Sequence, residues 1–252
     1  MKKLFFFLLS FPILLHSQIN ESDTVRLKAQ VALSGVWQEG NVETLIFRAK
    51  QGLTYRPYNG WVVKSQNSYV YQAFGGTKAD EDILSLNFLY LHPERSFYPQ
   101  VLGFISTNFR RAIDVRYLFG LGFTYQVWQH KDHWLKFSIS SEYEKTRFNQ
   151  LTFNLAEYND DSTLNTFRGT LWVNGKYSLF DKKLILSHES FLQPSLNKSN
   201  NYRWRADLGI EIPLVKYLNF KINYLHAFES IVILGQQRED QFLTFGFNVK
   251  SF

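Results

Sequence analysis

The chain has 252 residues, no cysteine, 45% hydrophobic and 17% aromatic residues, and 28 basic against 22 acidic side chains. The aromatic content excludes a disordered chain, and the absence of cysteine excludes disulfides, zinc–thiolate sites and a thiol nucleophile. After the first 20 residues every apolar run is far shorter than the ~20 residues that a membrane-spanning helix needs, which excludes a helical membrane protein.

Residues 1–17 have the pattern of a secretory signal peptide. Lys2 and Lys3 precede an apolar run, which small and polar residues follow. The run is too short for a membrane anchor and contains Pro12, which disfavours a spanning helix. We therefore expect export, removal of this segment, and a short periplasmic segment at 18–24. Without Lys2 and Lys3 the net charge falls from +6 to +4, and no basic cluster indicates nucleic-acid binding.

From residue 25 onward, apolar residues recur at every second position, which is typical of strands with one apolar face. The stretch 116–128 is the clearest example, because its odd positions are aromatic or aliphatic and its even positions include Arg116, Gly120 and Gly122. This periodicity predicts twelve strands, at 26–38, 43–56, 61–74, 82–92, 97–109, 116–128, 133–147, 163–179, 183–193, 201–212, 217–228 and 241–251.

The connections between these segments alternate in length. Those after even-numbered segments are short, whereas most of those after odd-numbered segments are longer, including 75–81, 148–162 and 229–240. Short periplasmic turns and long extracellular loops are typical of outer-membrane barrels.

We therefore expect an all-β fold: a closed antiparallel transmembrane β-barrel of twelve strands at 25–252, in the outer membrane. Closure is expected because an unpaired backbone group in hydrocarbon costs several kcal/mol, and the last strand can pair with the first. The alternative is a soluble β-sandwich or lipocalin-like barrel, which would bury its aromatic face. Gly120, Gly122 and Gly209 on the charged face favour a narrow polar interior instead.

Alternation assigns two sets of side chains. The charges expected to face the lumen are Arg48, Lys50, Arg116, Arg168, Lys176, Arg203, Arg205, Asp207, Glu211 and Lys221. The aromatic residues expected to face lipid are Tyr117, Phe119, Phe123, Tyr125, Trp204, Phe220, Phe245 and Phe247.

Over all segments this alternation gives twelve bases and five acids on the lumen side, a surplus of seven. Two interpretations are open. The charges pair with one another and fill the interior, or the surplus bases form a narrow path that favours anions, as rings of Arg and Lys do. A wide general porin is not expected, because wide channels occur at 16–18 strands.

Three stretches carry a resemblance to a known family. Residues 34–55 place a Gly-Asn hairpin before a long alternating strand, 110–127 place Asp and Arg before a Gly-x-Gly-x-x-Tyr strand, and the stretch from Leu186 to the end contains a Ser-Leu-Asn loop at 195–197. Together they resemble the salt-induced outer-membrane protein family, β-barrels of unknown function. The resemblance implies location and architecture, and it carries over no catalytic residue.

The expected function is that of a structural or narrow-channel protein that is not an enzyme and has no cofactor or metal site. A barrel-embedded hydrolase is one alternative, suggested by His188 and Ser190. Glu189 points to the opposite face, however, and residues two apart on a strand are too distant for a nucleophile–base hydrogen bond. Another alternative is an accessory subunit that docks a partner through loops 148–162 and 229–240, the second of which contains the apolar run 231–234.

The expected partners are outer-membrane lipids, including lipopolysaccharide, and the barrel-assembly machinery, whose clients end in an aromatic residue as this chain does at Phe252. Arg110 and Arg111 form a basic rim that suits lipopolysaccharide phosphates, or else a solvated loop. Asp114 and Arg116, two apart on one face, are expected to pair beside this rim.

Overall fold

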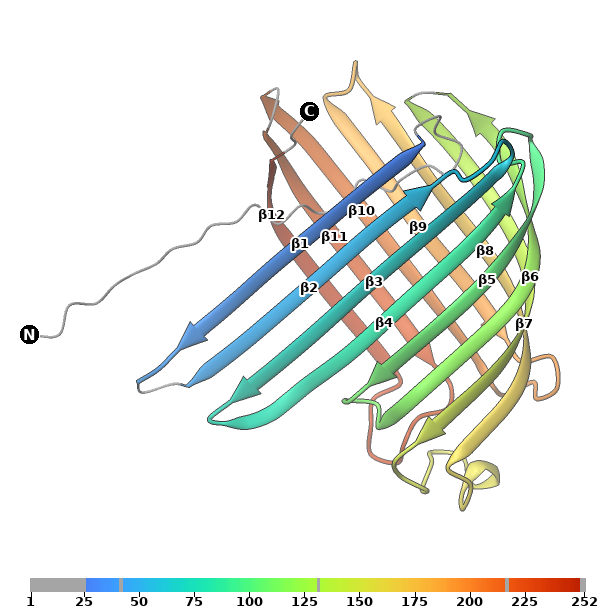
Figure 1. Ribbon diagram of the computed structural model, residues 1–252. Helices are drawn as coiled ribbons and strands as arrows, with labels where there is room; N and C mark the ends of the chain where they lie inside the picture. The colour runs from blue at the N-terminus through green and yellow to red at the C-terminus, as the bar shows by residue number, and fades with distance from the viewer. Residues whose placement is uncertain (1–25, 41–42, 131, 216–217, 250–252) are drawn as a thin grey trace, which may run out of the picture.

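The computed structural model describes residues 26–40, 43–130, 132–215 and 218–249. In them, twelve strands form one antiparallel sheet in which each strand pairs with its neighbours along the chain (Figure 1). The strands are β1 Leu27–Gln38, β2 Thr44–Tyr55, β3 Trp61–Phe74, β4 Thr77–Leu91, β5 Phe97–Asn108, β6 Ile113–Gln129, β7 His133–Phe148, β8 Thr163–Leu179, β9 Leu184–Pro194, β10 Tyr202–Val215, β11 Leu218–Glu229 and β12 Glu239–Val249, and one 3-10 helix, η1 Ala156–Tyr158, lies between β7 and β8.

None of the helical turns in the described residues is long and apolar enough to cross a membrane. The expected signal peptide, the segment 18–24 and the terminal Phe252 lie outside the described residues.

A strand lies at each of the twelve expected segments, and the largest difference is at the start of β4. The expected loop at 75–81 is wrong, because the chain reverses at Gly75 and Gly76 and β4 begins at Thr77. Both glycines have positive φ, 54° and 72°, which a two-residue hairpin turn requires and which glycine adopts without strain.

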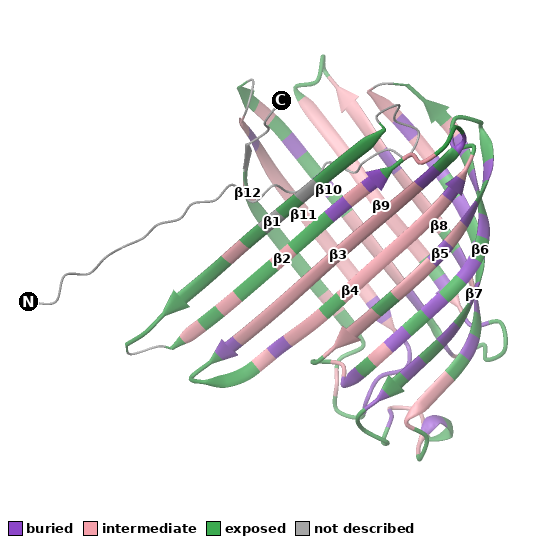
Figure 2. Cartoon of the chain, viewed as in Figure 1, coloured by how far each residue is buried: buried purple, intermediate pink, exposed green. Residues whose placement is uncertain are grey.

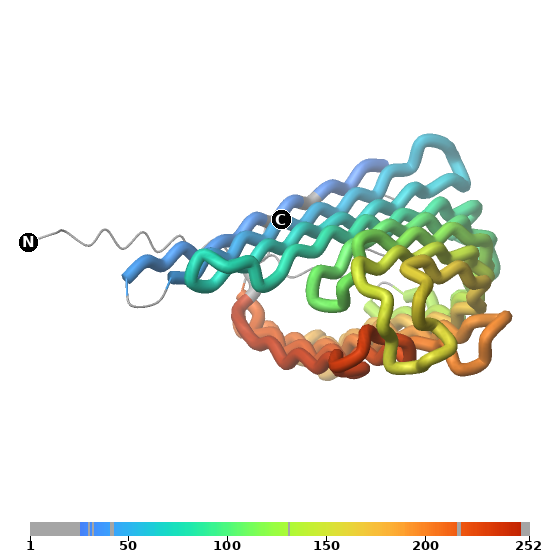
Figure 3. Tube along the Cα trace, turned by 90° about the horizontal axis from the view of Figure 1, so that it is seen from below, coloured from blue at the N-terminus to red at the C-terminus, as the bar shows by residue number. Residues whose placement is uncertain are grey.

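The sheet curls so that its first and last strands form opposite walls, joined by the middle strands (Figures 1 and 3). The pairing of β1 with β12 that would close a barrel is not present in the described residues. All other neighbours are consecutive in the chain and joined by a turn or a loop, whereas β1 and β12 are far apart in the chain. Both edge strands carry exposed apolar side chains, such as Trp37 on β1 and Phe245 on β12.

The two faces of the sheet differ in character, most clearly on β6 and β7 (Figure 2). We call the face with the buried Arg116, Thr124 and Gln126 the inner face, and the face with the exposed Phe119 and Phe123 the outer face. The strand registers extend this assignment to every strand of the sheet.

Gly120 and Gly122 lie on the inner face where β6 and β7 approach closely. A Cβ at Gly120 would lie 2.5 Å from Cγ of Glu142, and one at Gly122 would lie 2.4 Å from the carbonyl oxygen of Ile139. Glycine at these two positions therefore allows the close approach of β6 and β7.

Candidate ion network at the loop end

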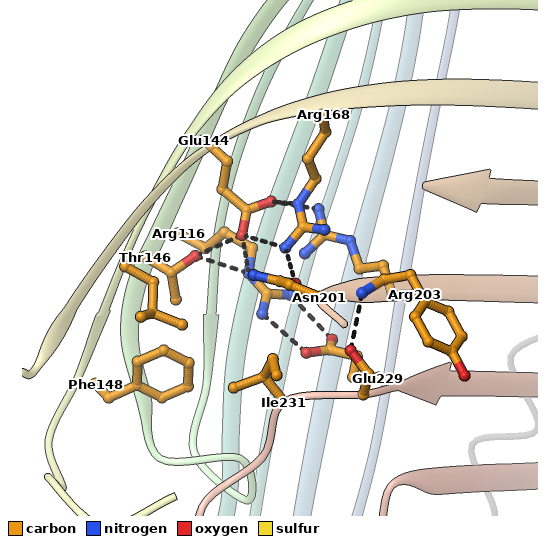
Figure 4. Close-up of a pocket in the computed structure, with 12 residues that line it drawn as sticks. Arg116, Glu144, Thr146, Phe148, Arg168, Asn201, Arg203, Glu229 and Ile231 are labelled. Carbon is orange, nitrogen blue, oxygen red and sulfur yellow. Dashed lines mark hydrogen bonds and ion pairs between the residues drawn. The ribbon is translucent and has the colours of Figure 1, made fainter. Parts of the chain in front are cut away.

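Five charged side chains meet on the inner face near the end of the sheet that carries the long loops (Figure 4). They are Arg116 on β6, Glu144 on β7, Arg168 on β8, Arg203 on β10 and Glu229 on β11, and we call them the ion network. Each lies within a few residues of the loop end of its strand, so the curl of the sheet brings them together.

Glu144 is the centre of the ion network, and its side chain is only 2% exposed. Its carboxylate accepts hydrogen bonds from Nε of Arg168 at 2.6 Å and from Nη2 of Arg203 at 2.7 Å. The hydroxyl of Thr146 donates to the same carboxylate at 2.9 Å. A buried carboxylate with several charge-assisted hydrogen bonds is stabilised in its ionised form.

Arg116 links two walls of the sheet that are not neighbours. Its Nη1 and Nη2 donate to the two carboxylate oxygens of Glu229 at 3.0 and 2.9 Å, and its Nε donates to Thr146 at 3.1 Å. Because Arg116 is on β6 and Glu229 is on β11, this bidentate pair spans the interior. Together with the Glu144–Arg203 pair it connects β6 and β7 to β10 and β11.

Amide side chains complete the ion network. Arg168 donates to Oδ1 of Asn201 at 2.9 Å and to the carbonyl oxygen of Gln193 at 3.2 Å, and Nε of Arg203 donates to the side chain of Gln193. Nη1 of Arg203 is buried and has no hydrogen-bond partner among the described residues. The cavity between these groups measures about 10 Å³, roughly the space of one water molecule.

Two long loops cover the ion network. Phe153, from the loop between β7 and β8, forms a β-bridge with Ile233, from the loop between β11 and β12. Both pack with Ile231, and with Phe148 at the end of β7, in a buried apolar cluster that we call the loop cluster. The rings of Phe148 and Phe153 are perpendicular, with centroids 4.9 Å apart.

The loop cluster changes the interpretation of the apolar run 231–234. Ile231, Val232 and Ile233 are 3–5% exposed, and only Leu234 is largely exposed, at 63%. Three of the four residues expected to attract a partner therefore pack within the chain. In the same cluster, burial and the charge of Glu157 raise the pKa of the Tyr158 hydroxyl above its ordinary value.

All ten charged residues expected to face the lumen lie on the inner face, but only Arg116, Arg168 and Arg203 belong to the ion network. Farther from the loop end, Arg205 donates a hydrogen bond to Asp207 at 3.1 Å. Asp207 also accepts a hydrogen bond from Asn223 at 2.9 Å. The other five of the ten expected residues are Arg48, Lys50, Lys176, Glu211 and Lys221. Of these, Lys50 lies within electrostatic range of Arg48, Arg205, Asp207 and Lys221.

Alternation alone missed four inner-face acids. Asp80 and Asp82 belong to the part of β4 that was expected to be loop or strand end, and Glu229 and Asp240 lie just beyond the expected ends of strands eleven and twelve. With them the described strands carry nine inner-face acids against eleven bases, and Lys250 lies outside the described residues. The four acids lower the expected surplus of seven to three, and without Lys250 the described strands have a surplus of two.

The rim also differs from the expectation. Asp114 does not pair with Arg116, because a bulge in β6 separates them; it lies 3.5 Å from Nε of Arg147 instead. Arg110 pairs with Asp80 at 3.2 Å, and Arg111 pairs with Asp240. The arginines of the rim therefore already have acidic partners within the chain.

The eight aromatic residues expected to face lipid all lie on the outer face. Six are exposed, whereas Trp204 and Phe220 are half-buried by neighbouring rings such as His226 and Phe247. His188 also lies on the outer face, and its Nε2 is 3.2 Å from the hydroxyl of Tyr177. Glu189 lies opposite Asp207 on the inner face, on the other side of the sheet from His188, as expected from alternation.

Comparisons with known proteins place the chain in a family but do not give it an activity. No curated protein matches the chain. Among solved structures, the NanC porin has 11% identity and a TM-score of 0.49 over 89% of this chain and 99% of its own. The translocator domain of the autotransporter NalP from Neisseria meningitidis has 14% identity and a TM-score of 0.46, over 92% of this chain and 91% of its own. The β-domain of the Bordetella autotransporter Brka has 11% identity and a TM-score of 0.39, over 88% of this chain and 97% of its own. These values are too low to support a statement about activity.

A family model matches residues 31–250, which is most of the chain and includes nearly all of the three stretches that carry the sequence resemblance. The description of the family does not mention salt, so the match does not confirm the name of the family that the sequence resembles. By this match the chain belongs to the family described as protein of unknown function, DUF481.

Proposed function

We propose that the protein is an outer-membrane β-barrel with a narrow passage that the ion network holds shut at the loop end. The aromatic outer face, the charged inner face and the export-type N-terminus support this location. In hydrocarbon, unpaired backbone groups on β1 and β12 are costly, which favours pairing of these two edges into a closed barrel of twelve strands. In this proposal the partners are outer-membrane lipids and the assembly machinery, and the protein is not an enzyme.

The observation that carries the proposal is the bidentate Arg116–Glu229 pair, which spans the interior from β6 to β11. An ion that crosses the barrel at this level has to displace a buried, charge-assisted pair. The cavity beside the pair, about 10 Å³, has no room for a hydrated ion. The loop cluster, centred on Phe153 and Ile233, lies above it as a second barrier.

Once open, the passage would favour anions only weakly. The eleven bases and nine acids of the inner face leave a small positive surplus. Part of that surplus is concentrated around Lys50, which has Arg48, Arg205 and Lys221 within electrostatic range. Rings of basic side chains lower the barrier for anions, although acids such as Asp207 reduce this effect.

Planar-bilayer recordings of the purified protein test the proposal. We expect wild type to show little or no conductance. The double variant Arg116→Ala/Glu229→Ala removes the pair without leaving a buried charge unpaired, so its conductance should rise. A matched control, Arg147→Ala/Asp114→Ala, removes an ion pair whose side chains are 59% and 39% exposed, and it should behave as wild type.

A wide-pore conductance in wild type, or equal conductance in both double variants, would contradict a passage shut by the ion network. Under a salt gradient, the reversal potential of the open variant should show a mild anion preference. A cation preference would contradict the role assigned to the inner-face bases.

A further inference from the structure

The outer face of β2, β3 and β4 carries a group of polar side chains where the neighbouring strands lead us to expect apolar ones. We call this group the polar belt: Gln51 on β2, Ser65 and Asn67 on β3, and Ser85 and Asn87 on β4. Gln51, Asn67 and Ser85 lie directly opposite one another across the three strands, and Ser65 lies opposite Asn87.

The side chains of the polar belt are hydrogen-bonded to one another. Nδ2 of Asn67 donates to Oε1 of Gln51 at 3.0 Å and to the hydroxyl of Ser65 at 3.1 Å. Ser65 donates to Oδ1 of Asn87 at 2.7 Å. Nδ2 of Asn87 in turn donates to the hydroxyl of Ser85 at 2.9 Å. In the described part of the chain, this leaves Nε2 of Gln51 and Oδ1 of Asn67 without a side-chain partner.

The polar belt lies at the depth where a membrane is most apolar. Asn67 is near the middle of β3, between Trp61 and Phe74. A strand of this length, at about 3.3 Å per residue and tilted by roughly 45°, extends past an apolar band about 25 Å tall at both ends. At the corresponding depth of β6, the outer face carries Phe119, Leu121 and Phe123. An amide group with a free donor or acceptor is costly in hydrocarbon, which argues that protein covers the polar belt.

We propose that the polar belt is the centre of an interface between two copies of this chain, related by a two-fold axis along the membrane normal. This inference rests on the proposed location in a membrane. Two copies inserted in the same direction present their belts at the same depth, whereas an unrelated partner would need a polar group at that depth by coincidence.

The chemistry of the polar belt is also self-complementary. Each copy has a free amide donor, on Gln51, and a free acceptor, on Asn67. A two-fold axis brings the donor of one copy to the acceptor of the other, and the reverse. Hydrogen bonds between amides are a recognised means of association inside membranes.

Single-cysteine cross-linking tests the interface, because the chain has no cysteine of its own. Asn67→Cys and Ser65→Cys place a thiol in the polar belt, and Phe119→Cys places one on the outer face of β6, three strands away from β3. The full chain is oxidised in its native membranes, and folding of each variant is checked by its heat-dependent gel mobility. We expect a disulfide-linked dimer for at least one belt variant and none for Phe119→Cys, because a disulfide needs Cα atoms within about 7 Å.

A second experiment removes the amide groups of the polar belt by substitution. Gln51→Leu/Asn67→Leu should abolish the dimer of the detergent-extracted protein while the barrel stays folded. Asn165→Leu, which removes an outer-face amide near the loop end of β8, should leave the dimer intact.

Three results would overturn the interface: a monomer in the membrane with no belt cross-link, equal cross-linking of belt and control positions, or a cross-linked product with the mass of a different protein. Recovery of the chain in the soluble fraction would instead contradict the proposed membrane location, so the two failures are distinguishable.

Discussion

Replacement of Glu144 tests the ion network most directly. Its carboxylate is the shared acceptor of Arg168 and Arg203, at 2.6 and 2.7 Å, and Nε of Arg116 lies 3.7 Å away. Glu144→Ala leaves two buried guanidinium groups without their main acceptor. Removing one partner of a buried ion pair costs about 3–5 kcal/mol, so we expect the free energy of unfolding to fall by that amount. Glu144→Gln keeps the shape and loses the charge, and it should cost less.

The assay is urea unfolding of the protein folded in lipid vesicles, followed by tryptophan fluorescence and by gel mobility. Glu43, an exposed acid in the connection between β1 and β2, supplies the control, because Glu43→Ala should change the free energy of unfolding by less than about 0.5 kcal/mol. A loss below about 1 kcal/mol for Glu144→Ala would refute the reasoning, since it would mean that water solvates the arginines. A double-mutant cycle of Glu144→Gln and Arg203→Gln then measures the coupling free energy between these two side chains.

Three further substitutions test the faces and the loops by the same unfolding assay. Gly120→Ala should cost about 1–3 kcal/mol, because its Cβ would lie 2.5 Å from Glu142, whereas Gly103→Ala meets no atom within 4 Å and should cost little. Phe119→Arg should cost about 2–4 kcal/mol if the outer face meets lipid, and a neutral result would contradict that orientation. Phe153→Ala should open the loop cluster and increase protease cleavage of the loops while the strands stay protected; unchanged cleavage would show that this ring does not hold the loops together.

The strands could be predicted from the sequence because successive side chains point to opposite faces of a strand and the two faces carry different residue types. The residue type therefore alternates along the chain with a period of two. On β6 the alternation of aromatic and small or polar residues continues through the strand, and only the ends were misplaced. The start of β4 was missed for a local reason. Asp80 and Asp82 continue the alternation of that strand, but acidic residues beside two glycines are also typical of a loop, and the two patterns compete.

The ion network could be predicted only in part. Arg116, Arg168 and Arg203 follow from alternation, since each lies in the interior of an expected strand or next to its end. Their partner Glu229 was missed because it lies one residue beyond the expected end of strand eleven, although it has the same parity as Lys221. Which arginine pairs with which glutamate depends on the curl of the sheet, and the period of a single strand contains no information about that.

The same curl connects the ion network to the question of closure. The Arg116–Glu229 and Glu144–Arg203 pairs hold β10 and β11 at a fixed distance from β6 and β7. In the described sheet β12 pairs with β11 alone, and the loop end of β12 is also held by the pair between Arg111 and Asp240. The position of β12 relative to β1 is therefore set partly by buried charges and not by any turn. In the closed barrel that we propose, a variant that loosens the ion network should also weaken the pairing of β1 with β12, so conductance and unfolding ought to change together when Glu144 is replaced. A change in one without the other would show that the loop end and the seam are independent.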